Sequence, residues 1–260
     1  MVDVFGLTGA QFETFLLVFV RVSAMLFVFP VFSAPQVPLM VRFGLSGLIS
    51  FMIFRVIPAV PISHGLYYLL LGVAAQIVLG MIVGFVAQLV FIGIQFAGEL
   101  IDLQIGFAVA NVINPTTQQQ VTIIGEFELA IATLVFLATD SHHFLLQGIA
   151  GSFSVVPLPY IKLDPGVAGN IVLFLTQSFL IVFKIAAPIT VALFLTNVAL
   201  AFAARVAPQM NVFVIGLPLQ IGVGLIMMAI SLPLLGTVAP QLFENIAHQM
   251  NVVMQGLSTT

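Results

Sequence analysis

The chain has no cysteine and no tryptophan, and only 6% of its 260 residues are charged. The absence of cysteine excludes a disulfide framework and any thiolate metal site. A soluble domain carries about 25% charged residues, whereas 61% of this chain is hydrophobic. The composition therefore predicts a membrane protein that crosses the bilayer several times. Six lysines and arginines in all argue against nucleic-acid binding.

Aromatic residues are unevenly represented, with 25 phenylalanines but only three tyrosines. Tyrosine and tryptophan usually gather where lipid-facing helices meet the headgroups. Their scarcity indicates that much of this apolar surface contacts protein instead of headgroups.

Charge is missing altogether from residues 56–98, which contain no Asp, Glu, Lys or Arg. Residues 66–98 also lack proline, and as one helix they would be about 50 Å long, against about 30 Å of hydrocarbon. We expect one long helix, or two collinear helices, packed against protein beyond the bilayer. Gly80 and Gly84 form a small-xxx-small pair that lets another helix approach closely.

The other apolar segments predict further helices over 12–32, 40–58 and 121–139, and about six membrane segments in total. Residues 144–156 are too few to span. Residues 167–236 are typical of a helical hairpin whose prolines kink or break both arms, and 241–257 of an amphipathic surface helix. Arg21 lies well inside its segment, so a buried partner is expected for it.

A polar insert, residues 99–120, interrupts the apolar chain. It is either an ordinary connecting loop or a segment that lies in a passage. Glu99 and Asp102 share a helix face if the helix continues. They are then either a proton or ion site or a polar helix end that meets water. Glu126 and Glu128 follow the insert, where the N-terminus of a helix favours acids.

No catalytic motif of the GxSxG, HExxH, P-loop or GxGxxG type occurs, so we expect neither an enzyme nor a cofactor. His142 and His143 predict no metal site, because adjacent histidines on a helix point in different directions and no third ligand is expected nearby. Two classes remain. One is an ion-coupled secondary transporter, and the other is a pore-forming subunit of an oligomeric channel whose insert closes the conduit.

Three stretches resemble the FliR family, the export-gate subunits of bacterial flagellar secretion. Residues 205–220, RVAPQMNVFVIGLPLQ, match its R-x-x-P-Q-x-N-V-F-x-x-G-x-P block. The run GELIDLQIGF over 98–107, with Asn114 and Pro115 downstream, is the second. Arg21 with the later Phe29-Pro30 pair is the third. The resemblance covers most of the chain.

The resemblance implies an all-α membrane protein whose long kinked helices and hairpins form part of a helical export-gate assembly. It implies FliP and FliQ as partner subunits, joined by FlhB, in the bacterial inner membrane at the flagellar basal body. The assembly would pass unfolded flagellar proteins. The implied division is a FliP-like part (1–98), a plug loop (99–120), a helix and connection (121–166), a FliQ-like hairpin (167–236) and a tail (237–260).

The resemblance also assigns roles to residues. The pore plug falls on Gly106, Phe107, Ala108, Val109, Ala110, Asn111, Val112, Ile113, Asn114 and Pro115, with Gly106 for backbone freedom and Phe107 for bulk. Subunit and structural roles fall on Arg21, Glu99, Asp102, Arg205, Pro208, Gln209, Asn211 and Pro218, and the small-xxx-small spacing adds Gly80 and Gly84 to them.

Overall fold

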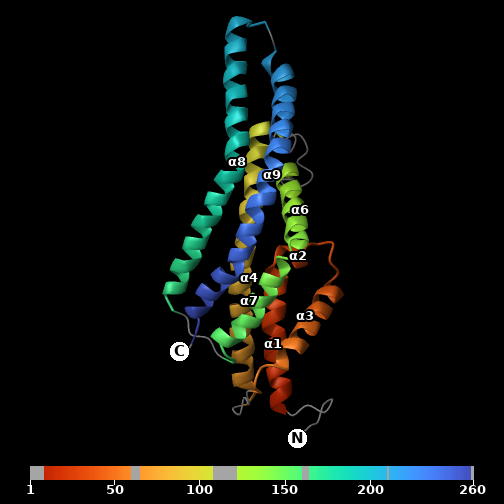
Figure 1. Cartoon of the computed structure of the whole chain (residues 1–260), viewed down its shortest axis with the longest axis vertical. Coiled ribbons are helices and arrows are strands. Elements are labelled where there is room, and N and C mark those ends of the chain that lie inside the picture. Colours follow the sequence, from red (N-terminus) through yellow and green to blue (C-terminus); the bar gives the residue numbers. More distant parts are fainter. Residues whose placement is uncertain (1–8, 60–64, 108–121, 160–163, 210, 259–260) are drawn as a thin grey trace. The chain divides into compact units, whose positions relative to one another are not determined.

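The computed structural model describes residues 9–59, 65–107, 122–159, 164–209 and 211–258, and these form helices and their connections without a strand. The chain is therefore an all-α protein, as its composition predicts. The helices are α1 (Gly9–Val28), α2 (Pro30–Ser33), α3 (Leu39–Phe54), α4 (Leu66–Ile105), α6 (Ile123–Ala138), α7 (His142–Val155), α8 (Gly166–Val206) and α9 (Val212–Gln255) (Figure 1).

Four of the described helices, α1, α4, α8 and α9, are long and apolar enough to cross a membrane. This confirms the prediction of a membrane protein but gives fewer crossings than the six or so expected. The helices α3 and α6 have 16 residues each and α7 has 14. At 1.5 Å per residue they are shorter than the hydrocarbon core.

The long helices continue through the positions where the sequence pattern predicted kinks or breaks. α4 is one helix of 40 residues that includes Glu99 and Asp102. α8 continues through Pro188, and α9 continues through Pro218, Pro233 and Pro240. Prolines are tolerated in membrane helices when the backbone groups that they free find other partners.

The predicted amphipathic tail is the end of α9, and its apolar face is not left for a membrane surface. Ile246, Met250 and Val253 are almost fully buried within the chain. Met250 lies against Gly148 of α7, where a Cβ on the glycine would come within 2.6 Å of the methionine Cε. The tail helix therefore packs on its own chain.

The chain divides into two compact units that do not follow its linear order. One contains 1–89, 141–175 and 243–260, and the other contains 90–140 and 176–242. The helices α4, α8 and α9 each contribute residues to both units.

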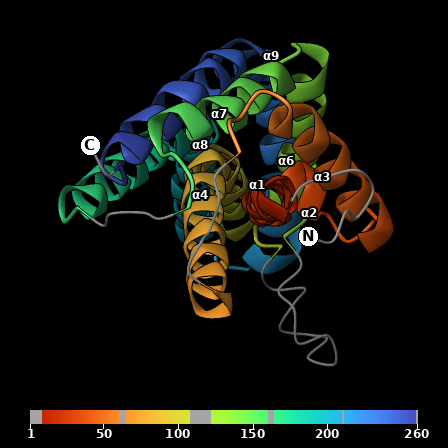
Figure 2. The same ribbon diagram turned by 90° about the horizontal axis from the view of Figure 1, so that it is seen from below.

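In the first unit, α1 packs directly on α4 through the glycine pair. A Cβ on Gly80 would lie 2.6 Å from the carbonyl oxygen of Arg21, and one on Gly84 would lie 2.9 Å from that of Met25. Figure 2 looks along α1 and shows α2 and α3 beside it. The close helix neighbour that the small-xxx-small pair predicted belongs to the same chain.

Arg21 is fully buried in this unit, and its partners are not acids. Its Nε donates to Oε1 of Gln76 at 2.6 Å, Nη1 donates to the Ser152 carbonyl at 3.0 Å, and Nη2 donates to the Val156 carbonyl at 2.9 Å. The guanidinium carbon lies 4.2 Å from the centre of the Phe153 ring. Since the two carbonyls end α7, the arginine occupies the negative end of that helix dipole. Arg21 thereby joins α1, α4 and α7.

Replacing Arg21 by methionine should strongly destabilise the chain, because each acceptor left buried without a donor costs about 1–3 kcal/mol. We expect a clearly lower thermal unfolding midpoint for Arg21→Met in detergent. Arg55→Met is the matched control, since Arg55 is exposed and its guanidinium lies over the Phe51 ring. Equal midpoints for the two variants would contradict this role for Arg21.

Candidate functional site at the ends of the central insert

Residues 99–105 of the central insert belong to α4, and its non-helical part begins at Gly106, which ends the helix. Gly106 has a φ of +93°, a conformation that glycine adopts without the steric cost of a Cβ. The N–H groups of Gly106 and Phe107 both donate to the carbonyl of Asp102 at 3.1 Å, which caps the end of the helix. Phe107 is half-buried. The rest of the predicted plug, Ala108 to Pro115, lies outside the described residues, so its role stays a prediction.

Asp102 links the two ends of the insert. Its carboxylate accepts hydrogen bonds from the backbone N–H of Ile124, at 3.1 and 3.0 Å for the two oxygens, and from that of Gly125 at 3.4 Å. Thr122, the N-cap residue of α6, makes no capping hydrogen bond with its side chain. Asp102 thus caps α6 from α4, where a carboxylate satisfies unpaired N–H groups and complements the helix dipole.

Two glycines allow this arrangement. A Cβ on Gly98 would lie 2.5 Å from Cα of Gly125, and one on Gly125 would lie 3.1 Å from the carbonyl oxygen of Gln95. The backbones of α4 and α6 are therefore in direct contact at Gly98, which precedes the insert, and at Gly125, which follows it. The insert is a closed loop with anchored ends.

Glu99 and Asp102 differ in how far their side chains are exposed to solvent. Asp102 is only 4% exposed, so the expectation that it meets water at a helix end is wrong. Glu99 is half-buried and its Cγ lies near Gly125, 3.3 Å from where a Cβ would stand. The two acids share α4 but not one environment.

Glu128 is an additional buried acid that the sequence pattern assigned only to the start of a helix. It is 2% exposed, and its Oε2 has no hydrogen-bond partner among the described residues. α6, which carries it, is not among the helices long enough to cross a membrane. Burial, and secondly the negative charge of Asp102, raise the pKa of Glu128 to about 8. Glu128 therefore holds a proton at neutral pH.

The structure brings together two of the stretches on which the family resemblance depends. A Cβ on Gly106 would lie 3.8 Å from Oε1 of Gln220 and 4.0 Å from Cδ1 of Leu217, both at the end of the 205–220 block. Nε2 of Gln220 also donates to Oδ1 of Asn197 on α8. The polar pair Asn197 and Gln220 was not predicted as part of the site, because a lone amide on an apolar helix gives no signal of its neighbour.

The other residues of that block to which roles were assigned lie at the surface of the isolated chain. Arg205, Pro208, Gln209 and Asn211 are exposed at the turn between α8 and α9, and Pro218 is exposed on α9. A different residue makes the tight contact here. A Cβ on Gly224 would come within 2.5 Å of Cδ1 of Ile105, so this glycine sets the approach of α9 to the end of α4.

The prediction that His142 and His143 point in different directions is wrong. Their ring centres lie 4.4 Å apart with an angle of 31° between the rings. Both side chains belong to the first turn of α7, where rotation about the side-chain bonds brings neighbouring rings together. The expectation that no third ligand lies nearby is also wrong, because ligand atoms of Asp140, His142 and His143 all lie within 4.8 Å of one another. The absence of a metal site there stays a prediction.

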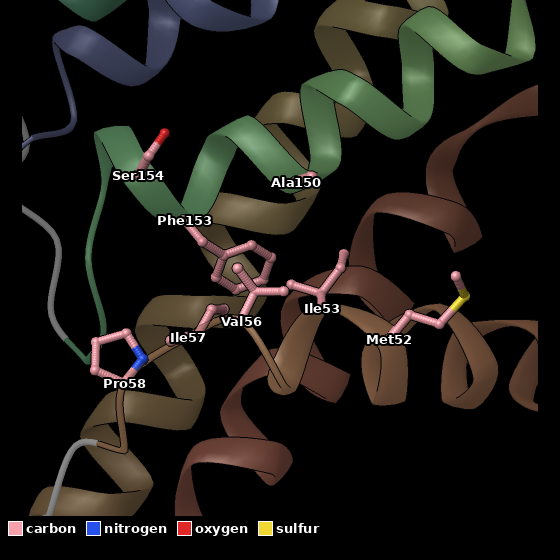
Figure 3. Close-up of a pocket in the computed structure, with 8 residues that line it drawn as sticks. All are labelled: Met52, Ile53, Val56, Ile57, Pro58, Ala150, Phe153 and Ser154. Carbon is pink, nitrogen blue, oxygen red and sulfur yellow. The ribbon is translucent and has the colours of Figure 1, made fainter.

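An apolar pocket of about 430 Å³ opens in the first unit, away from the insert. Figure 3 shows that the end of α3 and the segment after it contribute one wall and α7 the other. The lining residues are Met52, Ile53, Val56, Ile57, Pro58, Ala150, Phe153 and Ser154. Phe153, whose ring also contacts Arg21, places the pocket beside the buried arginine.

The fold and the site define an all-helical membrane protein whose polar insert is anchored at both ends by one buried carboxylate. A comparison with known protein families identifies the family to which it belongs. The family described as bacterial export proteins, family 1, matches residues 12–246. The chain belongs to this family, the FliR family of flagellar biosynthesis.

The relatives agree with this assignment. The chain is 36% identical to a flagellar biosynthetic protein FliR of Bacillus subtilis, over 90% of this chain and 91% of that protein. It is 31% identical to one of Escherichia coli, over 91% of each. A third, from Aquifex aeolicus, is 34% identical over 85% of this chain and 86% of that protein. The likeness therefore extends over nearly the full length of each relative.

The raised pKa of Glu128 predicts a pH-dependent stability. Between about pH 4.5 and 8 the folded chain retains a proton that the unfolded chain releases. The free energy of unfolding should therefore fall as the pH rises through this range, by at most about 1.4 kcal/mol per pH unit. Glu128→Gln removes this titration and should flatten the dependence, which thermal unfolding at pH 5 and 8.5 would measure.

The matched control is Glu126→Gln, two residues away on the same helix. Glu126 is exposed and accepts a long hydrogen bond of 3.4 Å from Gln95. It should keep the pH dependence of the wild type. A Glu128→Gln variant that loses as much stability between pH 5 and 8.5 as the wild type would overturn the assignment.

Proposed function

We propose that this chain is a core subunit of the flagellar type III protein export gate. In this proposal it assembles with FliP and FliQ, joined by FlhB, in the bacterial inner membrane at the flagellar basal body. Together the subunits form a channel for unfolded flagellar proteins. The observation that carries the proposal is the family match over residues 12–246, together with relatives whose names are flagellar biosynthetic protein FliR.

In this proposal the central insert closes the channel while it is idle. A channel that passes unfolded chains must not leak ions while it is idle. The insert suits a plug because Asp102 anchors both of its ends, so the loop can change its path without unravelling the helices beside it. Its asparagines and glutamines can bind neighbouring groups without bringing fixed charge into the passage.

The starting point of the plug supports the same role. A Cβ added to Gly106 would make only ordinary van der Waals contacts with the described residues, the nearest at 3.8 Å. Its neighbours are the flexible ends of Gln220 and Leu217. A glycine in this conformation can redirect the chain at low steric cost, and Phe107 directly after it supplies the bulk that fills a lumen. The energy for export comes from elsewhere in this proposal, since the sequence contains no nucleotide-binding motif.

An ion-coupled secondary transporter is the second candidate. One observation favours it, namely that Glu128 is a buried protonated carboxyl close to Asp102 in a membrane protein, which is a common arrangement for proton coupling. Such a transporter would work alone or as a homo-oligomer and would need no smaller membrane partners.

The native mass of the gently solubilised protein separates the two functions. We expect the chain expressed with its neighbouring membrane genes to appear in a large complex with several copies of smaller partners. The same chain expressed alone is the control and should not reach that mass. A stable monomer or homodimer that is indifferent to the neighbours would overturn the export-gate function and favour the transporter.

Shortening the insert tests the plug itself. Replacing residues 108–115 by a short glycine–serine link, with Asp102 and Gly106 retained, should raise the ion permeability of membranes that contain the full complex. The control replaces the same residues by a glycine–serine segment of unchanged length with one large apolar residue kept. Conductance that stays at the wild-type level in a fully assembled shortened complex would contradict the plug.

A further inference from the structure

Lys184 is an isolated charge on α8. From Gly166 to Ala204 the helix contains no other Asp, Glu, Lys or Arg. At 1.5 Å per residue, Lys184 lies about 27 Å from the start of the helix and about 33 Å from its end. With 41 residues the helix is about twice as long as the hydrocarbon core is thick, and Lys184 lies near its middle.

The side chain of Lys184 is exposed in the isolated chain. No hydrogen bond or ion pair is formed by its ammonium group with the residues that the structure describes. The described acids of the same unit belong to α4, to α6 and to the turn after α6. The charge of Lys184 is therefore not neutralised within this unit.

The surroundings of Lys184 are an apolar helix face. Leu180 and Val191 are each 57% exposed and Leu195 is 60% exposed, and Ala187 and Pro188 between them are exposed as well. The spacing of these residues places them on one side of α8. We call the set Leu180, Lys184, Ala187, Pro188, Val191 and Leu195 the Lys184 face.

Pro188 adds a second polar group to the same place. A proline has no backbone N–H, so the carbonyl four residues earlier in a helix loses its hydrogen-bond donor. Here that carbonyl belongs to Lys184 itself. One residue therefore presents both an ammonium group and a carbonyl without its usual helical partner, in the middle of an apolar face.

Lipid does not suit this face. A charged side chain at the centre of a membrane helix is costly and normally faces protein or water, where it pairs with an opposite charge. The free carbonyl also needs a donor in a medium without water. A protein surface that supplies a carboxylate meets the need of the ammonium group, and an N–H or O–H donor on the same surface would meet that of the carbonyl. The surrounding leucines and valine suit an apolar helix.

We propose that the Lys184 face is an interface with a partner subunit in the membrane, whose helix presents an Asp or Glu side chain to Lys184. The proposal rests on the proposed function for the existence of such partners. The ion pair would specify the register of the partner helix, since an unpaired charge at any other register is costly.

Three substitutions at Lys184 test the pairing in the co-expressed complex. Lys184→Arg keeps the charge and should preserve the recovery of the complex. Lys184→Met keeps the length of the side chain but leaves the partner carboxylate unpaired, and it should lower recovery several-fold. Lys184→Glu places two acids together and should lower it at least tenfold.

Rescue identifies the partner group. Each Asp or Glu in the predicted membrane helices of the partners is replaced by Lys, one at a time, in the presence of Lys184→Glu. One of these changes should restore the complex, whereas the same change with wild-type Lys184 should weaken it. A merely structural role of Lys184 would give no such reciprocal rescue.

Whether a partner covers the Lys184 face can be measured independently by cysteine labelling, because the chain has no native cysteine. Val191→Cys should react with a membrane-permeant maleimide when the chain is expressed alone and should be protected in the complex. Equal labelling in both, together with a Lys184→Met complex recovered at the wild-type level or above, would show that the face meets lipid and would overturn the proposal. If the wild-type chain itself forms no complex with its neighbours, it is the proposed function that fails instead.

Discussion

The arrangement around the insert depends on the hydrogen bonds that the start of α6 donates to the carboxylate of Asp102. One carboxylate accepts the N–H groups of Ile124 and Gly125, while its own backbone carbonyl caps the end of α4. The end of one helix and the start of the next are therefore held by a single residue.

The buried charges of the two units follow the same physical rule with opposite signs. In one unit an aspartate satisfies the N-terminus of α6, and in the other Arg21 satisfies the C-terminal carbonyls of α7. A helix terminus offers several unpaired backbone groups and a partial charge of the matching sign. Each charge is thus neutralised without a buried ion pair, whose desolvation cost is high.

The charge of Asp102 also contributes to the protonation state of Glu128. The backbone donors satisfy Asp102, but Glu128 lies buried close to it without a partner for Oε2. Burial, and secondly repulsion by the negative charge of Asp102, disfavour the ionised form of Glu128, so this carboxyl retains its proton. Glu128, which is neutral, and Lys184, which is charged, therefore need different surroundings. The first is accommodated inside the chain, and the second requires a group from outside it.

Much of this protein could be predicted from its sequence. The run 66–98, which lacks both charge and proline, predicts a long apolar helix, and the spacing of Gly80 and Gly84 predicts a close helix contact, because hydropathy and residue size act locally and in register with the helix. Which residues meet across the fold could not be predicted. Asp102 and Gly125, Gly106 and Gln220, and Arg21 and Val156 are far apart in sequence, and apolar helices of similar composition can pair in many ways. Only the tertiary structure decided those pairs, since the choice depends on how closely particular backbones approach and on which unpaired helix ends lie within reach of a buried charge.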